Sequence, residues 1–158
     1  MTGLTIDDEI IDSSGALSAY YAAVDELRRR YGGDDADDNI ARIAELRPPS
    51  GLFLVARVDG NPAGGVGIRR IGEASDDIAE VKRLWVRADL RRHGVARALM
   101  NEIEDRSRKL GYQRLYLETG YAQPEALSFY ATIDWTPIPE FPPGAIAHHL
   151  SSRFTKSL

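Results

Sequence analysis

The chain has 158 residues, of which 43% are hydrophobic and 28% charged, a balance typical of a single globular domain spanning residues 1–158. Its lack of cysteine excludes disulfides, thiolate metal ligands and a cysteine nucleophile, and its net charge of −4 argues against general nucleic-acid binding. No apolar run is long enough to cross a bilayer and no basic segment precedes an apolar one at the N-terminus, so we expect a cytoplasmic protein without a membrane partner.

Two helices are predicted at the front of the chain. Residues 16–31 carry apolar side chains at helical spacing, and Ser13 or Ser14 could cap the start of that helix. A shorter helix is expected over residues 37–46, because Pro48-Pro49 prevents it from continuing.

A β-hairpin is predicted next. Leu52 to Val58 alternates as a strand does, Asp59-Gly60-Asn61-Pro62 favours a turn, and Ala63 to Ile71 would form the returning strand. The segment Gly64-Gly65-Val66-Gly67 lies inside that second strand with no helix behind it. This position favours a strand interior or a bulge over a nucleotide-binding loop.

A strand–helix–strand unit occupies the centre of the chain. Ile78 to Val86 and Arg114 to Glu118 are expected to be parallel strands, joined in the right-handed sense by a helix over residues 94–110. The helix is expected to bury one stripe of side chains and to expose the charged residues beside it. The stripe comprises Val95, Leu99, Ile103, Arg106 and Leu110, and the residues outside it are Glu102, Glu104, Asp105 and Arg108.

The remaining segments complete a mixed α/β fold. A helix is expected over residues 123–133, a strand from Trp135 to Ile138, and a final strand over residues 147–155. The predicted architecture therefore combines an antiparallel N-terminal hairpin with a central parallel β-α-β crossover, and no repeats or domain linkers interrupt it.

The turn Arg91-Arg92-His93-Gly94-Val95-Ala96 joins the central strand to the helix after it. A helix N-terminus presents unpaired N–H groups and a positive dipole end, and a glycine with small neighbours lets a bulky ligand approach, so the turn is a candidate phosphate cradle. Taken alone, these residues could equally form a solvated loop. In its context the turn resembles the acyl-CoA-binding motif of the GNAT superfamily of N-acyltransferases, because Arg91, Gly94 and Ala96 match that motif in register.

The resemblance extends from Leu52 to the C-terminus and, more loosely, to the two front helices. It implies that the central strand splays from its parallel neighbour and that the pantetheine arm of acetyl-CoA lies in the opening, pairing with strand backbone. No metal is implied. The implied cofactor-binding residues are Leu84, Trp85, Val86, Arg91, Arg92, His93, Gly94, Val95, Ala96, Gln123 and Phe129.

Two residues are candidates for the acid–base chemistry of N-acetyl transfer. The resemblance makes Glu80 the general base, acting through water, and Tyr130 the acid that donates to the leaving thiolate. Simple alternation places Glu80, Lys82, Leu84 and Val86 on one face of the strand, so Glu80 and Lys82 could instead be only a structural pair. Tyr130 could likewise be only a packing residue of an amphipathic helix.

Two positions depart from the family pattern. Gln123 stands where many relatives carry asparagine, which leaves its contact with the pantetheine arm open. Asp134 stands where a glycine usually precedes an aromatic residue, so a positive φ there would be adopted less easily. The adjacent His148 and His149 would point to opposite faces of a strand, which argues against their joint ligation of a metal.

The resulting hypothesis is an acetyl-CoA-dependent N-acetyltransferase that acts on a small-molecule amine. The sequence leaves the oligomeric state open, and a homodimer is one candidate because related domains often pair. The alternatives are an enzyme that acetylates a protein or peptide amine, and an acyl-CoA-binding module without catalytic activity. A toxin that acylates transfer RNA is disfavoured because the chain has a net negative charge.

Two acidic clusters are either solvated loops or a mouth that attracts a cationic amine. They comprise Asp34, Asp35, Asp37 and Asp38, and Asp7, Asp8, Glu9 and Asp12.

Overall fold

A seven-stranded mixed sheet organises the chain in the computed structural model, which describes residues 3–32, 40–145 and 150–158. The strands lie in the order β1-β2-β3-β4-β5-β7-β6. All neighbouring pairs are antiparallel except β4 and β5, which confirms the predicted mixed α/β class. The strand bounds are β1 Leu4–Glu9, β2 Leu52–Val58, β3 Asn61–Ile71, β4 Ile78–Val86, β5 Arg114–Thr119, β6 Thr136–Ile138 and β7 Ser152–Ser157.

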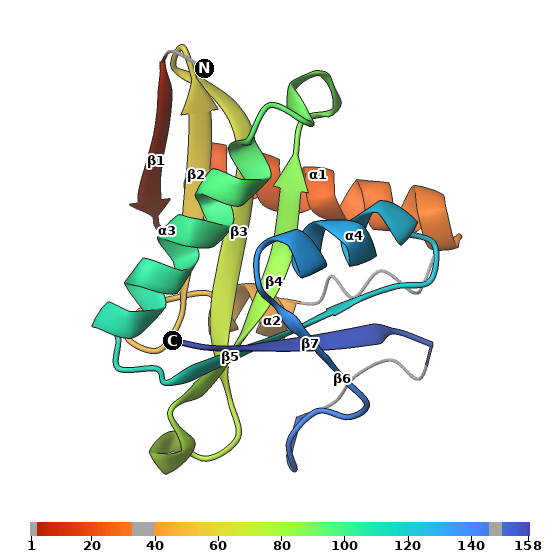
Figure 1. Ribbon diagram of the computed structural model, residues 1–158. Coiled ribbons are helices and arrows are strands. Elements are labelled where there is room, and N and C mark those ends of the chain that lie inside the picture. Colours follow the sequence, from red (N-terminus) through yellow and green to blue (C-terminus); the bar gives the residue numbers. More distant parts are fainter. Residues whose placement is uncertain (1–2, 33–39, 146–149) are drawn as a thin grey trace.

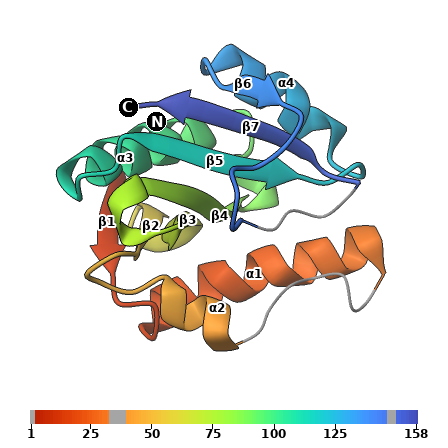
Figure 2. The same cartoon turned by 90° about the horizontal axis from the view of Figure 1, so that it is seen from below.

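Helices cover both faces of the sheet (Figures 1 and 2). Helices α1 (Ser14–Tyr31) and α2 (Ile40–Glu45) lie on one face, and α3 (Val95–Lys109) and α4 (Pro124–Thr132) lie on the other. Each face has its own apolar core: α1 packs on Phe53 and Val55, whereas α3 packs on Leu54 and its neighbours in β3 and β4. Ser13 caps α1 by accepting a hydrogen bond from the amide of Ala16, as one of the two predicted caps.

The parallel strands β4 and β5 separate soon after they meet. Their ladder covers only three residue pairs, Ile78 with Arg114, Ala79 with Leu115 and Glu80 with Tyr116. Beyond Glu80 the two strands diverge, and Figure 1 shows β5 leaving across the direction of β4 while α4 lies over the gap. The splayed strands expected from the family resemblance are therefore present.

A β-bulge interrupts β4 just where it begins to diverge from β5. Gly65 pairs with Trp85 and Gly67 with Lys82, so one residue of β3 faces two residues of β4, Arg83 and Leu84. Arg83 takes up the extra residue with a left-handed backbone at φ 59°. The glycine-rich segment of β3 is thus a strand interior, as predicted, and the extra residue belongs to its partner strand.

The bulge makes the predicted alternation along β4 wrong from Arg83 onwards. Lys82 and Arg83 both face α1, and the Arg83 guanidinium lies 5.4 Å from the centre of the Tyr20 ring. Leu84 packs into the core on the α3 face, and Trp85 packs on the α1 face. Glu80 and Lys82 share a face, but Leu84 and Val86 lie on the opposite one.

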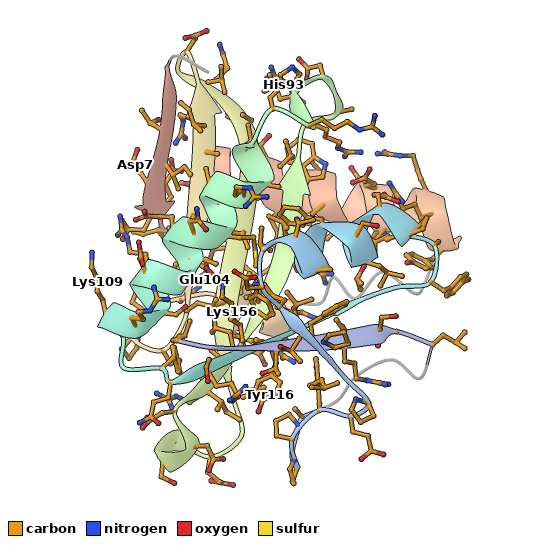
Figure 3. The ribbon with its side chains drawn as sticks, viewed as in Figure 1. Asp7, His93, Glu104, Lys109, Tyr116 and Lys156 are labelled. Atoms are coloured by element: carbon orange, nitrogen blue, oxygen red, sulfur yellow. The ribbon has the colours of Figure 1, made fainter. Side chains whose placement is uncertain are left out.

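The N-terminal acidic cluster forms part of a strand that the sequence analysis missed. Its residues flank or belong to β1 at the far edge of the sheet, where Figure 3 labels Asp7. Glu9 pairs with Arg57, Asp8 with Arg106, and Asp12 with Arg47. The cluster is therefore neither a solvated loop nor a mouth of the gap between β4 and β5, and the other cluster, at residues 34–38, lies outside the described residues.

Helix α3 buries a different stripe from the predicted one. Met100, Glu104 and Ser107 are buried beside Val95, Leu99 and Ile103, whereas Arg106 is partly exposed and Leu110 is 39% exposed. Glu104 was expected outside the stripe, but it tolerates burial because the Lys156 ammonium of β7 lies 2.7 Å from its carboxylate (Figure 3). The pair thus links α3 to the C-terminal strand.

The second helix and the final strand also differ in their bounds from the prediction. The second helix is described only over Ile40–Glu45, because the first residues of the predicted range 37–46 lie outside the described part. The final strand runs over Ser152–Ser157, whereas the prediction was residues 147–155, and the first three residues of that range lie outside the described part. His148 and His149 also lie outside the described residues. Asp134 has φ 66°, the conformation that the family's glycine would favour.

Candidate active site

A cavity of about 1230 Å³ fills the opening between the diverging strands. Its wall is built from β4, the end of β5, the C-terminal half of α1, helix α4 and the turns that join them. Such a volume exceeds that of most small-ligand pockets. Nine of the predicted site residues line it: Leu84, Trp85, Val86, Arg91, Arg92, Ala96, Gln123, Phe129 and Tyr130.

Four predicted residues lie outside this lining. Glu80 is buried, with 1% of its surface exposed, and Val95 is in the core at the start of α3. His93 and Gly94 are exposed in the turn before α3, and Figure 3 places His93 at that end of the molecule. The turn thus lies at the rim of the cavity, where Arg91, Arg92 and Ala96 reach the lining.

The N-terminus of α3 is open to a ligand. Gly94 is its N-cap with φ 86°, a conformation that favours glycine, and no side chain accepts a hydrogen bond from the first amides of the helix. A Cβ atom at Gly94 would meet open space, so the backbone conformation, and not crowding, explains the glycine. The free amides and the positive dipole end favour an anion at this position.

Arg91 is held in place by protein groups. Its Nε donates to the carbonyl of Val86 at 2.8 Å, and its Nη2 lies 2.9 Å from Oε2 of Glu26 in α1. These bonds tie the turn to the end of β4 and to the helix on the opposite face of the sheet. Arg92 is exposed with φ 63°, and its side chain reaches the cavity.

The edge of β4 that faces the cavity has backbone groups available for a ligand. Trp85 and Val86 pair with Gly65 and Gly64 of β3 on one side, whereas the ladder to β5 on the other side ends at Glu80. An extended chain could therefore pair along residues 81–86 in the way an added strand does. The bulge at Arg83 also frees backbone groups from the β3 ladder beside this edge.

Two cations surround the buried carboxylate of Glu80. Its Oε1 accepts a hydrogen bond from Arg69 Nε at 3.0 Å and lies 3.8 Å from Lys82 Nζ, so the predicted contact with Lys82 is present. Oε2 is buried and has no hydrogen-bond partner among the described residues. Burial lowers the pKa of Arg69, but the charge of Glu80 and the bond to Glu45 outweigh it and raise that pKa overall.

Tyr130 packs in the core and also lines the cavity. Its ring packs in the core, with ring centres 5.3 Å from Phe129, 5.5 Å from Phe154 and 6.2 Å from Trp135. It nevertheless lines the cavity while only 7% exposed. Burial raises the pKa of the Tyr130 hydroxyl well above its usual value, so the group stays protonated at neutral pH.

A bridge between α1 and α4 spans one side of the cavity, and the sequence analysis did not predict it. The Arg30 guanidinium lies 2.7 Å from Glu125 and donates to the carbonyl of Ala122 at 2.8 Å. The Tyr31 hydroxyl donates to Oε1 of Gln123 at 3.3 Å. Burial lowers the pKa of Arg30, but Glu125 and then Glu26 raise it overall, which keeps this cation charged.

The bridge also shows which protein groups the side chain of Gln123 contacts. Its Oε1 accepts from Gly120 N at 3.3 Å as well as from Tyr31, so the side chain holds the turn between β5 and α4. These contacts connect residues about ninety positions apart, which no local pattern could reveal.

The described residues contain neither a candidate metal site nor a candidate membrane-spanning helix. Among residues 3–32, 40–145 and 150–158, no three histidine or acidic side chains are grouped so that they could hold a metal ion. In the same part of the chain, none of the helices is both long and apolar enough to cross a membrane.

Comparison with known sequences places the chain among acetyltransferases. Residues 18–134 match the profile described as the acetyltransferase (GNAT) family. An IAA acetyltransferase of Azospirillum brasilense is 36% identical over 124 residues, which are 77% of this chain and 79% of that protein. An uncharacterized N-acetyltransferase of Escherichia coli, YjgM, is 28% identical over 60% of this chain, and the match spans 58% of the relative's length.

Solved structures share the fold at low sequence identity. An acetyltransferase of the GNAT family from Staphylococcus aureus superposes with a TM-score of 0.79 and 14% identity, and 98% of each chain is covered. A GNAT family acetyltransferase from Elizabethkingia anophelis, solved with acetyl-CoA bound, gives a TM-score of 0.70 and 14% identity over the whole of both chains. These superpositions support the fold and, at this identity, no finer property.

Proposed function

Because this chain belongs to the acetyltransferase (GNAT) family, we propose that it transfers the acetyl group of acetyl-CoA to the primary amine of a small molecule. The observation that carries the proposal is the single cavity that connects the open N-terminus of α3, the free edge of β4 and Tyr130. The acetyl-CoA bound to the related Elizabethkingia enzyme supports the same cofactor here.

In this proposal, each part of the site binds one part of acetyl-CoA. The pyrophosphate lies at the amides of the turn from Arg91 to Ala96, where the dipole of α3 favours an anion. Arg92 supplies a positive charge at the same rim. The pantetheine arm pairs with β4 at Leu84–Val86 and brings the thioester towards Tyr130 and Phe129.

The proposed reaction needs no covalent intermediate with the protein. The amine nitrogen attacks the thioester carbonyl, a C–N bond forms, and the C–S bond breaks to release the coenzyme A thiolate. The ammonium form of the amine must first lose a proton, which we assign to Glu80 through an intervening water that reaches the unpartnered Oε2. Backbone groups freed by the bulge at Arg83 would donate to the carbonyl oxygen as it gains charge.

Tyr130 supplies the donor for the leaving group. Burial raises the pKa of its hydroxyl further above that of a free thiol, which is about 8.5. The tyrosine is therefore the weaker acid, and the thiolate keeps its charge while it accepts a hydrogen bond from the hydroxyl. The hydroxyl therefore stabilises the departing sulfur. The proton released by the ammonium passes to solvent, and the thiolate later takes up a proton from solvent.

A small acceptor is favoured over a protein because the α1–α4 bridge covers one side of the cavity. Arg30, Glu125, Tyr31 and Gln123 cross it through side-chain contacts from both helices. A folded protein would have to displace these contacts to place a lysine side chain from that direction, whereas a small amine would not.

Calorimetric titration with acetyl-CoA, followed by an assay of coenzyme A release, tests the proposed function. We expect one binding site with micromolar affinity and thiol release that depends on an added amine. Binding without release for any primary amine would support a non-catalytic acyl-CoA-binding module, and no binding at all would contradict the acetyltransferase assignment.

Glu80→Gln tests the base. The substitution removes the proton acceptor but keeps the size of the side chain, so we expect kcat/KM to fall about 10- to 100-fold and the pH–rate profile to change. The pH–rate profile from pH 5 to 9 measures both. Glu45→Gln is the matched control, since Glu45 is the other carboxylate partner of Arg69 and does not line the cavity. An unaltered profile in Glu80→Gln would assign the proton transfer to another group or to bulk water.

A further inference from the structure

One guanidinium group in the cavity, that of Arg83, has no part in the proposed handling of acetyl-CoA. Arg83 lines the cavity, yet its Nη2 is buried and has no hydrogen-bond partner among the described residues. Its Cζ lies 5.4 Å from the centre of the Tyr20 ring, a cation–π contact that holds the group against α1. A buried donor of a charged group without an acceptor is costly, so this position is suited to a ligand that supplies one.

The backbone is strained in a way that serves this position. Arg83 has φ 59°, a left-handed conformation that is uncommon for a residue without a short polar side chain. The three aspartates with positive φ, Asp59, Asp77 and Asp134, lie in turns or at element ends, whereas Arg83 lies inside a strand. Such strain in a strand is typical of sites where a side chain must be aimed at a ligand.

The bulge also places a second cation beside the first. In a regular strand Lys82 and Arg83 would point to opposite faces, but here both face α1. Both line the same cavity. Lys82 is anchored 3.8 Å from Glu80, the proposed base, which places the cationic pair next to the group that would deprotonate the amine.

We propose that Arg83 binds a carboxylate of the acceptor, so that the acceptor is a primary amine that also carries a carboxylate, as an amino acid does. The inference rests on the proposed function and names the substrate class of the same site. An Arg guanidinium matches a carboxylate in geometry and forms strong charge-assisted bonds with it. The free Nη2 supplies one of these bonds without the loss of a protein contact.

The position of Arg83 favours the acceptor over the cofactor as its ligand. The α3 N-terminus and Tyr130, which the proposal assigns to the pyrophosphate and the thioester sulfur, belong to elements on the α3 face of the sheet. Arg83 faces α1, on the other side of β4. An acceptor that approaches from the α1 side would reach the thioester from the side away from the leaving sulfur.

The charges of the cavity agree with this class of acceptor. Five cationic side chains line it, against three carboxylates: Arg30, Lys82, Arg83, Arg91 and Arg92, and Glu26, Glu118 and Glu125. The chain as a whole has a net charge of −4, so the sign of the charge on the cavity lining is opposite to that of the whole chain. An amine with a carboxylate meets these cations without adding a net positive charge to the cavity.

The test compares pairs of acceptors that differ only in the carboxylate. A panel of α-, β- and γ-amino acids is assayed beside their primary carboxamides, and coenzyme A release is measured at saturating acetyl-CoA. We expect at least one amino acid to have a kcat/KM about 10- to 100-fold above that of its amide. Arg83→Met, which keeps the stem of the side chain, should reduce this ratio to near one and leave the acetyl-CoA affinity unchanged. Arg83→Lys, which keeps the charge, should retain part of the preference.

Each other outcome overturns the assignment. Equal kcat/KM values for amino acids and their carboxamides in the wild type would contradict it. An unchanged preference for the amino acids in a folded Arg83→Met protein would also contradict it. A large loss of acetyl-CoA affinity in Arg83→Met would assign the guanidinium to the cofactor. Turnover of neither class, with acetyl-CoA bound, would exclude amino carboxylates as acceptors. A wild-type protein that fails to bind acetyl-CoA is a different result, because it contradicts the proposed function itself.

Discussion

Gly94→Glu is expected to weaken acetyl-CoA binding about 100-fold or more, which calorimetric titration measures directly. Gly94 caps α3 with φ 86°, and the amides that follow it are open to an anion. A glutamate at this position places a carboxylate where the pyrophosphate is proposed to bind, so two anions would compete for the same dipole and amides. The core should remain folded, because a side chain at this position meets open space.

Gly94→Gln is the matched control for this effect. Glutamine has the same size and imposes the same left-handed strain, about 1–2 kcal/mol of stability, but it adds no charge. We expect its loss of affinity to be about tenfold smaller than that of the glutamate variant, and the difference between the two should shrink as salt is added. Affinity equal to wild type in Gly94→Glu would show that the phosphates bind elsewhere.

Tyr130→Phe is expected to lower the single-turnover rate of acetyl transfer about 100-fold and to leave acetyl-CoA affinity within about twofold. The ring contacts with Phe129, Trp135 and Phe154 survive the change, so only the donor to the leaving sulfur is lost. Because burial raises the pKa of the hydroxyl, the required protonated form persists to higher pH than for an exposed tyrosine. The wild-type rate should therefore show no loss from this group between about pH 6 and 9.

Tyr20→Phe provides the comparison. Tyr20 is buried as Tyr130 is, its hydroxyl has no partner within the described residues, and it does not line the cavity. Removing that hydroxyl should leave the transfer rate unchanged. Equal rates for Tyr130→Phe and wild type would remove the hydroxyl from the mechanism and leave Tyr130 as a packing residue only.

The elements of this fold could be predicted where a local signal defines them. The bounds of β2 and β4 match the prediction because turns of glycine, proline and aspartate flank the apolar runs. Strand β1 was missed because its acidic residues, Asp7, Asp8 and Glu9, look solvated when their partners are unknown. Arg57 and Arg106, which pair with this segment, lie about fifty and a hundred residues away.

The residues of the candidate site could likewise be predicted where they belong to a local motif, and could not where they depend on distant partners. The turn at Gly94 and the helix with Tyr130 are contiguous motifs, so the sequence alone places them on the right elements. The face of the sheet on which the Arg83 side chain lies could not be predicted, because the bulge depends on the pairing of β4 with Gly65 and Gly67 of β3. Burial of Glu104 likewise depends on Lys156, fifty-two positions later.

The three-residue ladder between β4 and β5 has a consequence for how the chain folds. Strands β1 to β4 pair largely with sequence neighbours, and β5 to β7 pair among themselves, so each set can form from contacts within itself. The two sets are joined by that short ladder, by α3, by the Glu104–Lys156 pair and by the bridge between α1 and α4. A ligand that binds between β4 and β5 contacts both sets and binds only when they are docked. Acetyl-CoA would therefore stabilise this junction more than either set alone, and local opening of the unliganded protein would begin there.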